Sequence, residues 1–511
     1  MPKCFVFAIG GTGSRVLRSL THLLAAGAKP RNNNFDIVPI VIDPHNDNKD
    51  LQRTQELMNL YKTIKGKAKP NDPNGFFPVE IKTLKELTPD DPNLPSTFTF
   101  ELEGANSTFS EFIGYSSMEP ENKALTELLF SGYSVDAKKR PRLLDIEMDI
   151  GFVGNPNVGS VVLNQIVESK IYKSFSTVGF FRPEDRIFII SSIFGGTGAA
   201  GFPCLLKNIR AGRTSIDSKA ENAALQNAKV GAVSVLPYFK LQDNNDSPIN
   251  YSDFIAKTKS ALSYYKENVT GKSRSVNAMY YIGDFTKGEN YENDSGRGGQ
   301  KNNANFVEIA GALAIIDFLE LEDSELKCEN GKAEKPIYKE FGLKRDAARP
   351  DFYDLGNDHK ALIEKPLSQF ALFRKFMMDE YPQKVGKMAW STATPHQLDI
   401  QFVNDTFYRT QMKPFFDDFN KWLEELSKNE RGFAPFNLEA TSLSLFINMP
   451  EDKKKSVTFT YDGSGFGPFA KKGFNDYLNT FAKETYQSKE TKLIDMFYKT
   501  TKEILEKEYK I

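Results

Sequence analysis

The sequence is poor in the residues that build disulfide frameworks and metal sites. Cysteine occurs only three times in 511 residues, at the widely separated positions Cys4, Cys204 and Cys328. An odd number of distant cysteines is typical of free thiols, so we expect a reducing, cytoplasmic location. The four histidines share no ligand-like spacing with one another or with cysteine. We therefore expect no metal ion held by protein ligands alone.

The chain also lacks an excess of either charge and any long hydrophobic run. Lys plus Arg (66) nearly equals Asp plus Glu (67), which gives no electrostatic reason to expect nucleic-acid or membrane binding. No stretch is long and apolar enough to span a bilayer, and the first residues do not resemble a signal peptide. A chain of 511 residues with 40% hydrophobic content is expected to form two or more globular domains.

One tetrapeptide, G-G-T-G, occurs twice, at residues 10–13 and 195–198. Each copy follows an apolar run typical of a buried strand and precedes a helical pattern. Glycine in such a turn lets main-chain N–H groups approach a phosphate closely, and the N-terminus of the following helix favours anions. The two copies together predict an anionic ligand that is bound from two sides.

Residues 1–245 alternate between continuous apolar runs and helical patterns, which indicates a parallel sheet with helices on both faces. Ligands of such sheets bind at the carboxyl ends of the strands, and both G-G-T-G motifs would lie there. The strands are expected at residues 4–9, 38–42, 187–193, 230–236 and 278–282.

Three further segments differ from this pattern. The polar, proline-rich residues 43–150 are expected to form an insertion with one possible strand at 98–102. The helix that Asn305 opens is apolar nearly all round, so we expect it to be buried between two domains. Beyond residue 330, strands are expected at 442–448 and 456–461, and an amphipathic helix at 489–509.

Two common nucleotide-binding motifs fit the sequence only in part. A dinucleotide-binding G-x-G-x-x-G would use Gly11 and Gly13 with Asp43, but Val16 replaces its third glycine and the second G-G-T-G is left unused. A P-loop would use residues 154–160, which read G-N-P-N-V-G-S and lack the phosphate-binding lysine. Neither motif accounts for the repeat.

The loops taken together resemble those of the tubulin and FtsZ superfamily. FtsZ-type proteins carry an N-P-x-x-G loop, a helix, a strand and a signature loop of the form G-G-G-T-G-[ST]-G that ends near a proline. Here residues 154–159 read G-N-P-N-V-G, and residues 194–201 read F-G-G-T-G-A-A-G with Pro203 beyond. Residues 9–14, I-G-G-T-G-S, resemble the family's first nucleotide loop. Further similarities lie at residues 41–43 (second strand and acidic turn), 235–238 (strand and proline before the ribose loop) and 304–307 (start of the central helix).

The resemblance, to a divergent bacterial tubulin-like protein, implies an α/β fold in three parts. These are a parallel-sheet nucleotide-binding domain over residues 1–300 with an insertion at about 43–150, a central connecting helix over 303–323, and a divergent α+β C-terminal domain over 330–511. It also implies GTP or GDP as the ligand, accompanied by Mg²⁺. Main-chain donors of the signature loop would wrap the phosphates, so that no P-loop lysine is needed.

The resemblance assigns roles to individual residues. Asn155 would close over the terminal phosphate, Asp243 is the nearest acidic candidate for a ribose hydroxyl, and Asn305 would present donor and acceptor to the purine edge. FtsZ places an aromatic residue one turn before this asparagine, where the present chain has Lys301. The implied nucleotide-binding residues are Gly10, Gly11, Thr12, Gly13, Ser14, Asp43, Asn155, Gly195, Gly196, Thr197, Gly198, Ala199, Asp243 and Asn305.

Hydrolysis in the family needs the next subunit, whose loop after the central helix supplies acidic groups that position the attacking water. The equivalent residues here, 320–325, read E-L-E-D-S-E and do not match the N-x-D-x-x-D pattern of FtsZ. Asp323 and Glu325 are the candidate catalytic acids in this stretch, and a solvated helix end is the alternative interpretation.

Two functions are compatible with the resemblance. The first is a GTPase that assembles head to tail into filaments through a heterologous, open-ended interface. The second is a non-polymerising nucleotide-binding switch or scaffold that acts with an unidentified protein partner. The family resemblance favours the first, whereas the divergent acidic loop and C-terminal region favour the second.

Overall fold

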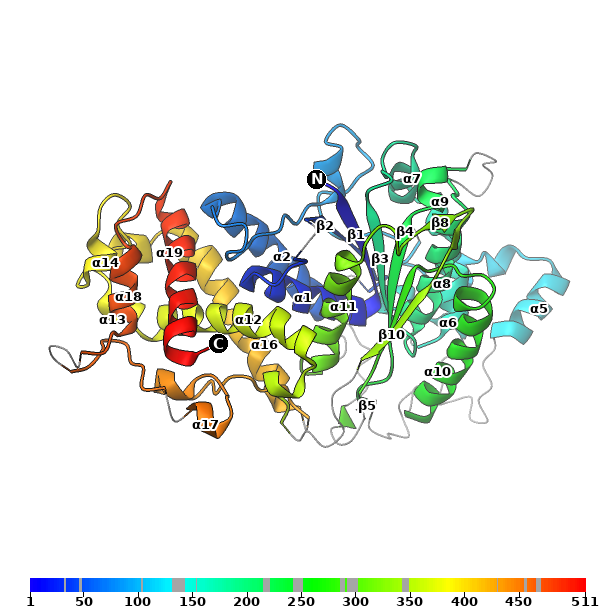
Figure 1. Cartoon of the computed structure of the whole chain (residues 1–511). Helices are drawn as coiled ribbons and strands as arrows, with labels where there is room; N and C mark the ends of the chain where they lie inside the picture. Colours follow the sequence, from blue (N-terminus) through cyan, green and yellow to red (C-terminus); the bar gives the residue numbers. More distant parts are fainter. Residues whose placement is uncertain are drawn as a thin grey trace.

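Six parallel strands form the main sheet in the part of the chain that the computed structural model describes (Figure 1), in the order β10-β6-β4-β3-β1-β2. The strands are β1 (Lys3–Ile9), β2 (Asp36–Ile42), β3 (Arg186–Ser192), β4 (Lys229–Val235), β6 (Ala278–Ile282) and β10 (Ile337–Phe341). The structure describes all residues except 32–33, 46–47, 103, 131–142, 153, 215–220, 242–250, 285–289, 292–301, 342–348, 430, 455–456 and 466–469. Asp243 and Lys301 therefore lie outside the described residues.

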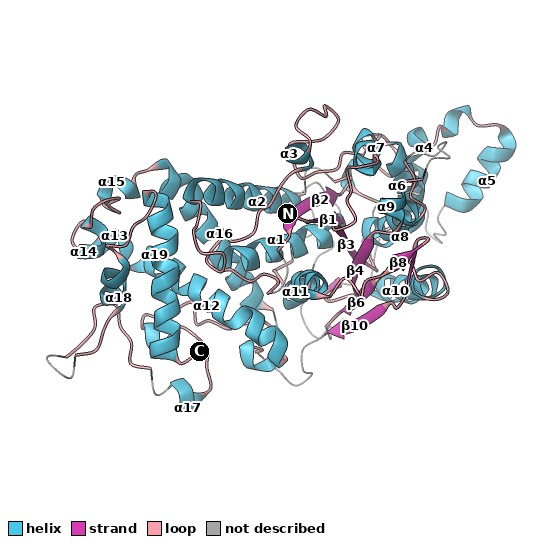
Figure 2. Cartoon of the chain, turned by 45° about the horizontal axis from the view of Figure 1, so that its top comes forward, coloured by secondary structure: helices cyan, strands magenta, loops and turns pink. Residues whose placement is uncertain are grey.

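Helices cover both faces of the sheet, as the continuous apolar runs predict (Figure 2). α1 (Gly10–Ala26) and α11 (Phe306–Glu320) lie on one face, and α8 (Gly196–Arg210) and α10 (Tyr251–Tyr265) on the other. β1, β2 and β3 are buried along almost their whole lengths. The sequence therefore predicts the mixed α/β class and the parallel sheet correctly.

The order of the strands places a crevice between β1 and β3. The chain passes from β1 to β2 on one side and later returns to β3 on the other side of β1, so the direction of strand order reverses at this pair. β1 and β3 pair in parallel with Ala8 opposite Ile190, and each strand ends next to one G-G-T-G motif. Open α/β sheets bind ligands at such a switch point.

α1 connects the sheet to the C-terminal helices. It packs on the sheet, on α11 and on α2 (Lys49–Ala68), and it also contacts α12 (Asn357–Asp379). α16 (Lys413–Lys428) reaches α1 as well, because the Trp422 indole stacks on His22 at 4.8 Å and its N–H donates to the Ser19 hydroxyl (3.3 Å). α1 is consequently buried on nearly every side, although only its apolar face would need burial in a surface helix.

The regular elements among the described residues beyond β10 are helices, so the expected α+β C-terminal domain is not confirmed. Besides α12 and α16 they include α18 (Phe474–Phe481) and α19 (Lys489–Ile504). In place of the strand expected at 442–448 there is a short 3₁₀ turn, and the pairings nearby are isolated bridges. The apolar residues there contribute to an aromatic core instead, in which Phe436 stacks on Phe446 at 5.4 Å.

The main sheet crosses the boundary expected near residue 330. β10 follows residue 330 and still pairs with β6, so the main sheet extends into the segment assigned to the C-terminal domain. The insertion at 43–150 begins with α2, which packs between α1 and α19. The strand expected at 98–102 is reduced to a bridge between Val41 and Thr99 along the outer edge of β2.

Two other expectations can be compared with the structure. Cys4, Cys204 and Cys328 carry free thiols, and burial raises the pKa of Cys4 to about 12. None of the helices in the described ranges combines the length and the apolar character that crossing a membrane requires.

Candidate functional site

The two G-G-T-G motifs lie in direct contact at the carboxyl ends of β1 and β3. Gly10 adopts a φ of +72°, and a Cβ atom placed on it would lie 3.4 Å from Cβ of Thr197 and 3.6 Å from the main-chain N of Gly198. A Cβ on Gly196 would lie 3.0 Å from the main-chain N of Asn155. Three segments, 10–13, 154–155 and 195–198, therefore converge on one site.

Each motif forms the first turn of a helix rather than a loop that precedes it. α1 begins at Gly10 and α8 at Gly196. In α8 the N–H of Ala199 is bonded to the carbonyl of Gly195 (3.3 Å), so the N–H groups of the three residues before Ala199 have no partner within the helix. Neither helix carries an acidic residue in its first turn. Both positive helix ends therefore remain available to an anion.

The last glycine of each motif brings its helix close to the strand before it. A Cβ on Gly13 would lie 2.6 Å from the carbonyl carbon of Ala8 in β1. A Cβ on Gly198 would lie 2.8 Å from the main-chain N and O of Ser192 in β3. Such distances exclude any side chain, so these two glycines set the close packing of helix against strand that the motif requires.

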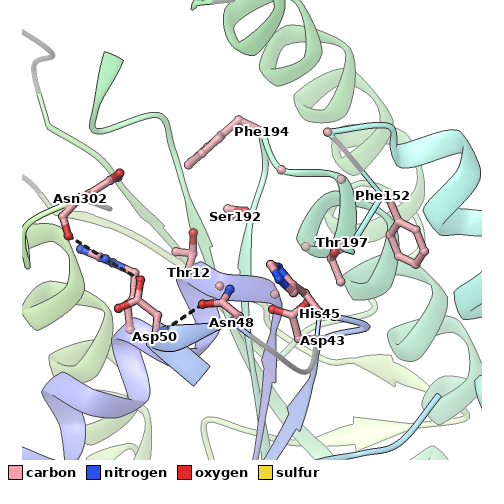
Figure 3. Close-up of a pocket in the computed structure, with 18 of the residues that line it drawn as sticks. Thr12, Asp43, His45, Asn48, Asp50, Phe152, Ser192, Phe194, Thr197 and Asn302 are labelled. Atoms are coloured by element: carbon pink, nitrogen blue, oxygen red, sulfur yellow. Dashed lines mark hydrogen bonds and ion pairs between the residues drawn. The ribbon is translucent and has the colours of Figure 1, made fainter. Parts of the chain in front are cut away.

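A cavity of about 230 Å³ opens between the motifs (Figure 3). Thr12, Asn302 and Phe194 lie toward one end of it in this view, and Thr197, His45 and Asp43 toward the other. Its wall is made by Gly10, Gly11, Thr12, Arg15, Asp43, His45, Asn48, Asp50, Ile150, Gly151, Phe152, Gly154, Ser192, Phe194, Gly195, Gly196, Thr197, Gly198, Tyr238, Phe239 and Asn302.

Asp43 and His45 form the part of the wall that follows β2. Asp43 is 5% exposed, and its carboxylate accepts the main-chain N–H of His45 (3.1 Å). Burial raises the pKa of Asp43 to about 7, although the N–H of His45 partly offsets this rise. Because oxygen ligands suit Mg²⁺ and a cation would compensate the buried charge, Asp43 is the side chain on this wall best suited to hold Mg²⁺ beside a phosphate.

Arg15 connects the cavity wall to α2 and α11 through a buried ionic network. Its Nε donates to Glu308 (2.6 Å) and its Nη1 to Asp50 (2.9 Å). Arg18, one turn further along α1, donates to the other oxygen of Asp50 (2.8 Å). Burial by itself would raise the pKa of Asp50, but the Arg15 and Arg18 guanidinium groups outweigh it and lower the pKa to about 2. Asp50 therefore stays ionised and holds the first turn of α2 against α1.

The structure brings most of the predicted binding residues to this cavity. Those on its wall are Gly10, Gly11, Thr12, Asp43, Gly195, Gly196, Thr197 and Gly198. Five others are not part of the wall: Gly13, Ser14 and Ala199 lie within α1 and α8, while Asn155 and Asn305 are the N-cap residues of α6 (Pro156–Leu163) and α11. Asp243 cannot be placed, since it lies outside the described residues.

Asp323 and Glu325 lie at the opposite end of the sheet from the cavity, beyond the last residue of α11. Asp323 forms ion pairs with Arg186 (2.9 Å) and Lys229 (2.8 Å), which begin β3 and β4. Glu325 accepts the main-chain N–H of Glu322 (2.9 Å). Neither carboxylate therefore approaches the cavity of its own chain.

Several wall residues were not expected from the sequence. Arg15 and Asp50 carry a signal in the sequence, because each is a charged residue next to residues that α1 and α2 bury. Phe194, Tyr238 and Phe239 follow the ends of β3 and β4, where ligands of parallel sheets bind. Asn48 and Asn302 give no comparable signal, since both occur in polar segments rich in Asn.

No protein-family model and no curated protein sequence matches the chain. Among solved structures, CetZ from Methanosaeta thermophila strain DSM 6194 aligns with it at 12% sequence identity and a TM-score of 0.26. The alignment covers 64% of this chain and 56% of that protein. A similarity at this level supports no argument about function.

Proposed function

We propose that this protein binds GTP and GDP as a tubulin/FtsZ-like GTPase that assembles head to tail into filaments. The observation that carries the proposal is the contact between the two G-G-T-G turns, seen where Gly10 meets Thr197 at the mouth of one cavity. Two helix N-termini converge there, whose first main-chain N–H groups have no partner within their own helix, and this arrangement is suited to a polyphosphate. The resemblance of the loops to the superfamily supplies the choice of guanine.

Each part of the cavity has a role in this proposal. The main-chain N–H groups of both turns bind phosphate oxygens, and the Thr197 hydroxyl can donate one further hydrogen bond. Asp43 holds a Mg²⁺ ion, which would neutralise part of the phosphate charge. Arg15 places a positive charge on the same wall, although its donors already serve Asp50 and Glu308.

Filament assembly is supported by the separation of the cavity from the candidate catalytic acids Asp323 and Glu325. The cavity lies near the first residue of α11, where Arg15 meets Glu308, whereas Asp323 follows its last residue and pairs with the start of β3. A head-to-tail contact would place the acidic residues of one protomer over the cavity of the next. Such a contact is heterologous, as an open-ended filament requires.

One observation favours the alternative of a nucleotide-binding switch that does not polymerise. Asp323 is already engaged by Arg186 and Lys229, and Glu325 closes its own turn on Glu322. Both acids would have to leave these partners before they could position a water molecule in a neighbouring subunit. Nucleotide binding is common to the two functions, and only assembly and hydrolysis distinguish them.

Light scattering and phosphate release, measured on the same samples with GTP, GDP and ATP, test the proposal. We expect GTP to induce scattering above a critical protein concentration, filaments in electron micrographs, and phosphate release that rises with assembly. Tight GTP binding without scattering or release would support the switch. Absence of binding to any of the three nucleotides would contradict both functions.

A further inference from the structure

Asn305, to which the family resemblance assigns the nucleobase, has a structural role at the start of α11. Asn305 is the N-cap of α11, and its Oδ1 accepts the main-chain N–H of Val307 (2.9 Å). An N-cap side chain held in this way satisfies one of the unpaired donors of the helix. Asn305 is also absent from the cavity wall. Its acceptor oxygen is therefore committed to the helix rather than to a ligand.

Asn302, three residues earlier, differs from Asn305 both in its position and in the pairing of its side-chain oxygen. It lies on the cavity wall, as Figure 3 shows, and its Oδ1 is buried without a hydrogen-bond partner among the described residues. A buried amide oxygen left unpaired costs free energy, so the site is expected to be completed by a donor from a ligand. An asparagine amide offers both an acceptor and a donor, as the hydrogen-bonding edge of a purine requires.

The main chain around Asn302 is held in place by Arg15. Nη1 of Arg15 donates to the carbonyl of Asn302 (3.1 Å), and Nη2 donates to the carbonyl of Asn303. Arg15 is itself held by Asp50 and Glu308. Three helices, α1, α2 and α11, thus fix the position of one short segment on the cavity wall. This is how a rigid network positions a side chain that must meet a planar ligand edge.

Aromatic rings line the same cavity. Phe194 and Phe239 are both wall residues, with ring centroids 5.6 Å apart in an edge-to-face arrangement. In Figure 3 Phe194 lies on the same side as Asn302, away from Thr197, His45 and Asp43. Aromatic faces together with a side-chain amide are the groups that proteins use to stack and to read an unpaired base. The cavity therefore has a nucleoside end distinct from its phosphate end.

We propose that Asn302, rather than Asn305, reads the base of the bound nucleotide, and that Arg15 is the positioning residue that holds it there. This inference rests on the proposed nucleotide binding and assigns base specificity within that same site. Phe194 and Phe239 supply the ring contacts, and Asn305 serves the start of α11.

Matched serine substitutions at the two asparagines test the inference. Serine is as good an N-cap as asparagine, so Asn305→Ser keeps the helix start and removes only the amide. Affinities for GTP and for inorganic tripolyphosphate are measured on the full chain by calorimetry. We expect Asn302→Ser to weaken GTP binding about tenfold or more and to leave tripolyphosphate binding unchanged, whereas Asn305→Ser changes neither by more than about threefold.

The outcomes separate this inference from the function on which it rests. Unchanged GTP binding in Asn302→Ser, or a tenfold loss in Asn305→Ser alone, would overturn it. An equal loss for GTP and tripolyphosphate in Asn302→Ser would overturn it too, because the residue would then act on the phosphate end or on the fold. If the unaltered protein binds neither compound, the proposed nucleotide binding itself fails.

A second variant tests the positioning role of Arg15. Arg15→Lys keeps the positive charge but loses the planar fork that reaches two carbonyls and two carboxylates. We expect it to reduce the ratio of GTP to ATP affinity at least severalfold while tripolyphosphate binding is retained. An unchanged ratio would contradict the role of Arg15, and thermal unfolding of the variant shows whether the fold is preserved.

Discussion

Gly10 lies against Thr197, so that the first residue of one G-G-T-G motif covers the hydroxyl-bearing residue of the other; a Cβ on Gly10 would come within 3.4 Å of the Thr197 Cβ. The motifs are 185 positions apart in the chain, as the difference between residues 195 and 10 gives. Parallel pairing of β1 with β3 brings them together, because strands that share a direction end at the same edge of a sheet.

Because Gly13 packs closely against β1, we expect a side chain at this position to destabilise the fold. Alanine normally stabilises a helix interior relative to glycine, but a Cβ on Gly13 would lie 2.6 Å from the backbone of Ala8. We expect Gly13→Ala to lower the free energy of unfolding by roughly 1–3 kcal/mol. Gly66 in α2 has no atom within 4 Å of a Cβ, so Gly66→Ala is the matched control and should raise it by about 0.5–1 kcal/mol. Urea denaturation measures both, and equal effects would refute the packing role.

Gly11 allows ligand binding to be tested separately from the fold. A Cβ on Gly11 would meet only the Asn48 amide, at 3.7 Å, within the cavity wall. We expect Gly11→Ala to leave the unfolding free energy within about 0.5 kcal/mol of the original and to weaken binding of both GTP and tripolyphosphate roughly tenfold. Calorimetric titration measures the affinities. Undiminished binding would mean that the first motif does not contact the phosphates.

Because the pKa of the buried Asp43 carboxyl is raised, we expect stability to depend on pH in the absence of nucleotide and metal. Its pKa rises from 3.8 to about 7 on folding, so the folded chain retains a proton that the unfolded chain loses between those values. Stability is therefore lost as the pH rises from about 4 to 7, by roughly 1–4 kcal/mol. Asp43→Asn should remove this loss and be more stable than the original protein at pH 8, but not at pH 4. Denaturation in EDTA at the two pH values measures the difference in unfolding free energy between the variant and the original protein. An equal difference at both pH values would contradict the raised pKa of Asp43.

Asp323 and Glu325 distinguish the two proposed functions. If a neighbouring subunit supplies the catalytic acid, Asp323→Asn combined with Glu325→Gln should abolish phosphate release and leave GTP affinity within about threefold. A suitable control is Glu322→Gln, because that residue contacts Glu325 through its main-chain N–H and carbonyl, which the substitution leaves in place. Phosphate release that persists in the double variant would exclude these residues from hydrolysis.

The strands that form the site could be predicted because they are buried on both faces. Such strands appear in the sequence as continuous apolar runs, and β6 (Ala278–Ile282) has the expected limits. The C-terminal region could not be predicted in the same way. Its short apolar segments pack against other aromatic residues, as Phe446 stacks on Phe436. A short apolar run does not reveal whether its partner is a strand or a ring.

The glycines of the site were predictable, and the side chains opposite them were not. A glycine turn between a strand and a helix has a physical reason that is visible in the sequence alone. Arg15 and Asn302 meet only because α1 and the segment before α11, 287 residues apart, pack together in the fold. The position of Asn305 at the start of α11, by contrast, is the one expected from the sequence, and its capping role follows from that position.

The structure of the protein with bound GDP and Mg²⁺, by crystallography or electron cryomicroscopy, tests the central claim most directly. We predict that phosphate oxygens lie within about 3.2 Å of main-chain nitrogens from both residues 10–13 and residues 195–198, in one cavity. Density for the nucleotide at any other place, or phosphates that contact only one of the two motifs, would contradict the account.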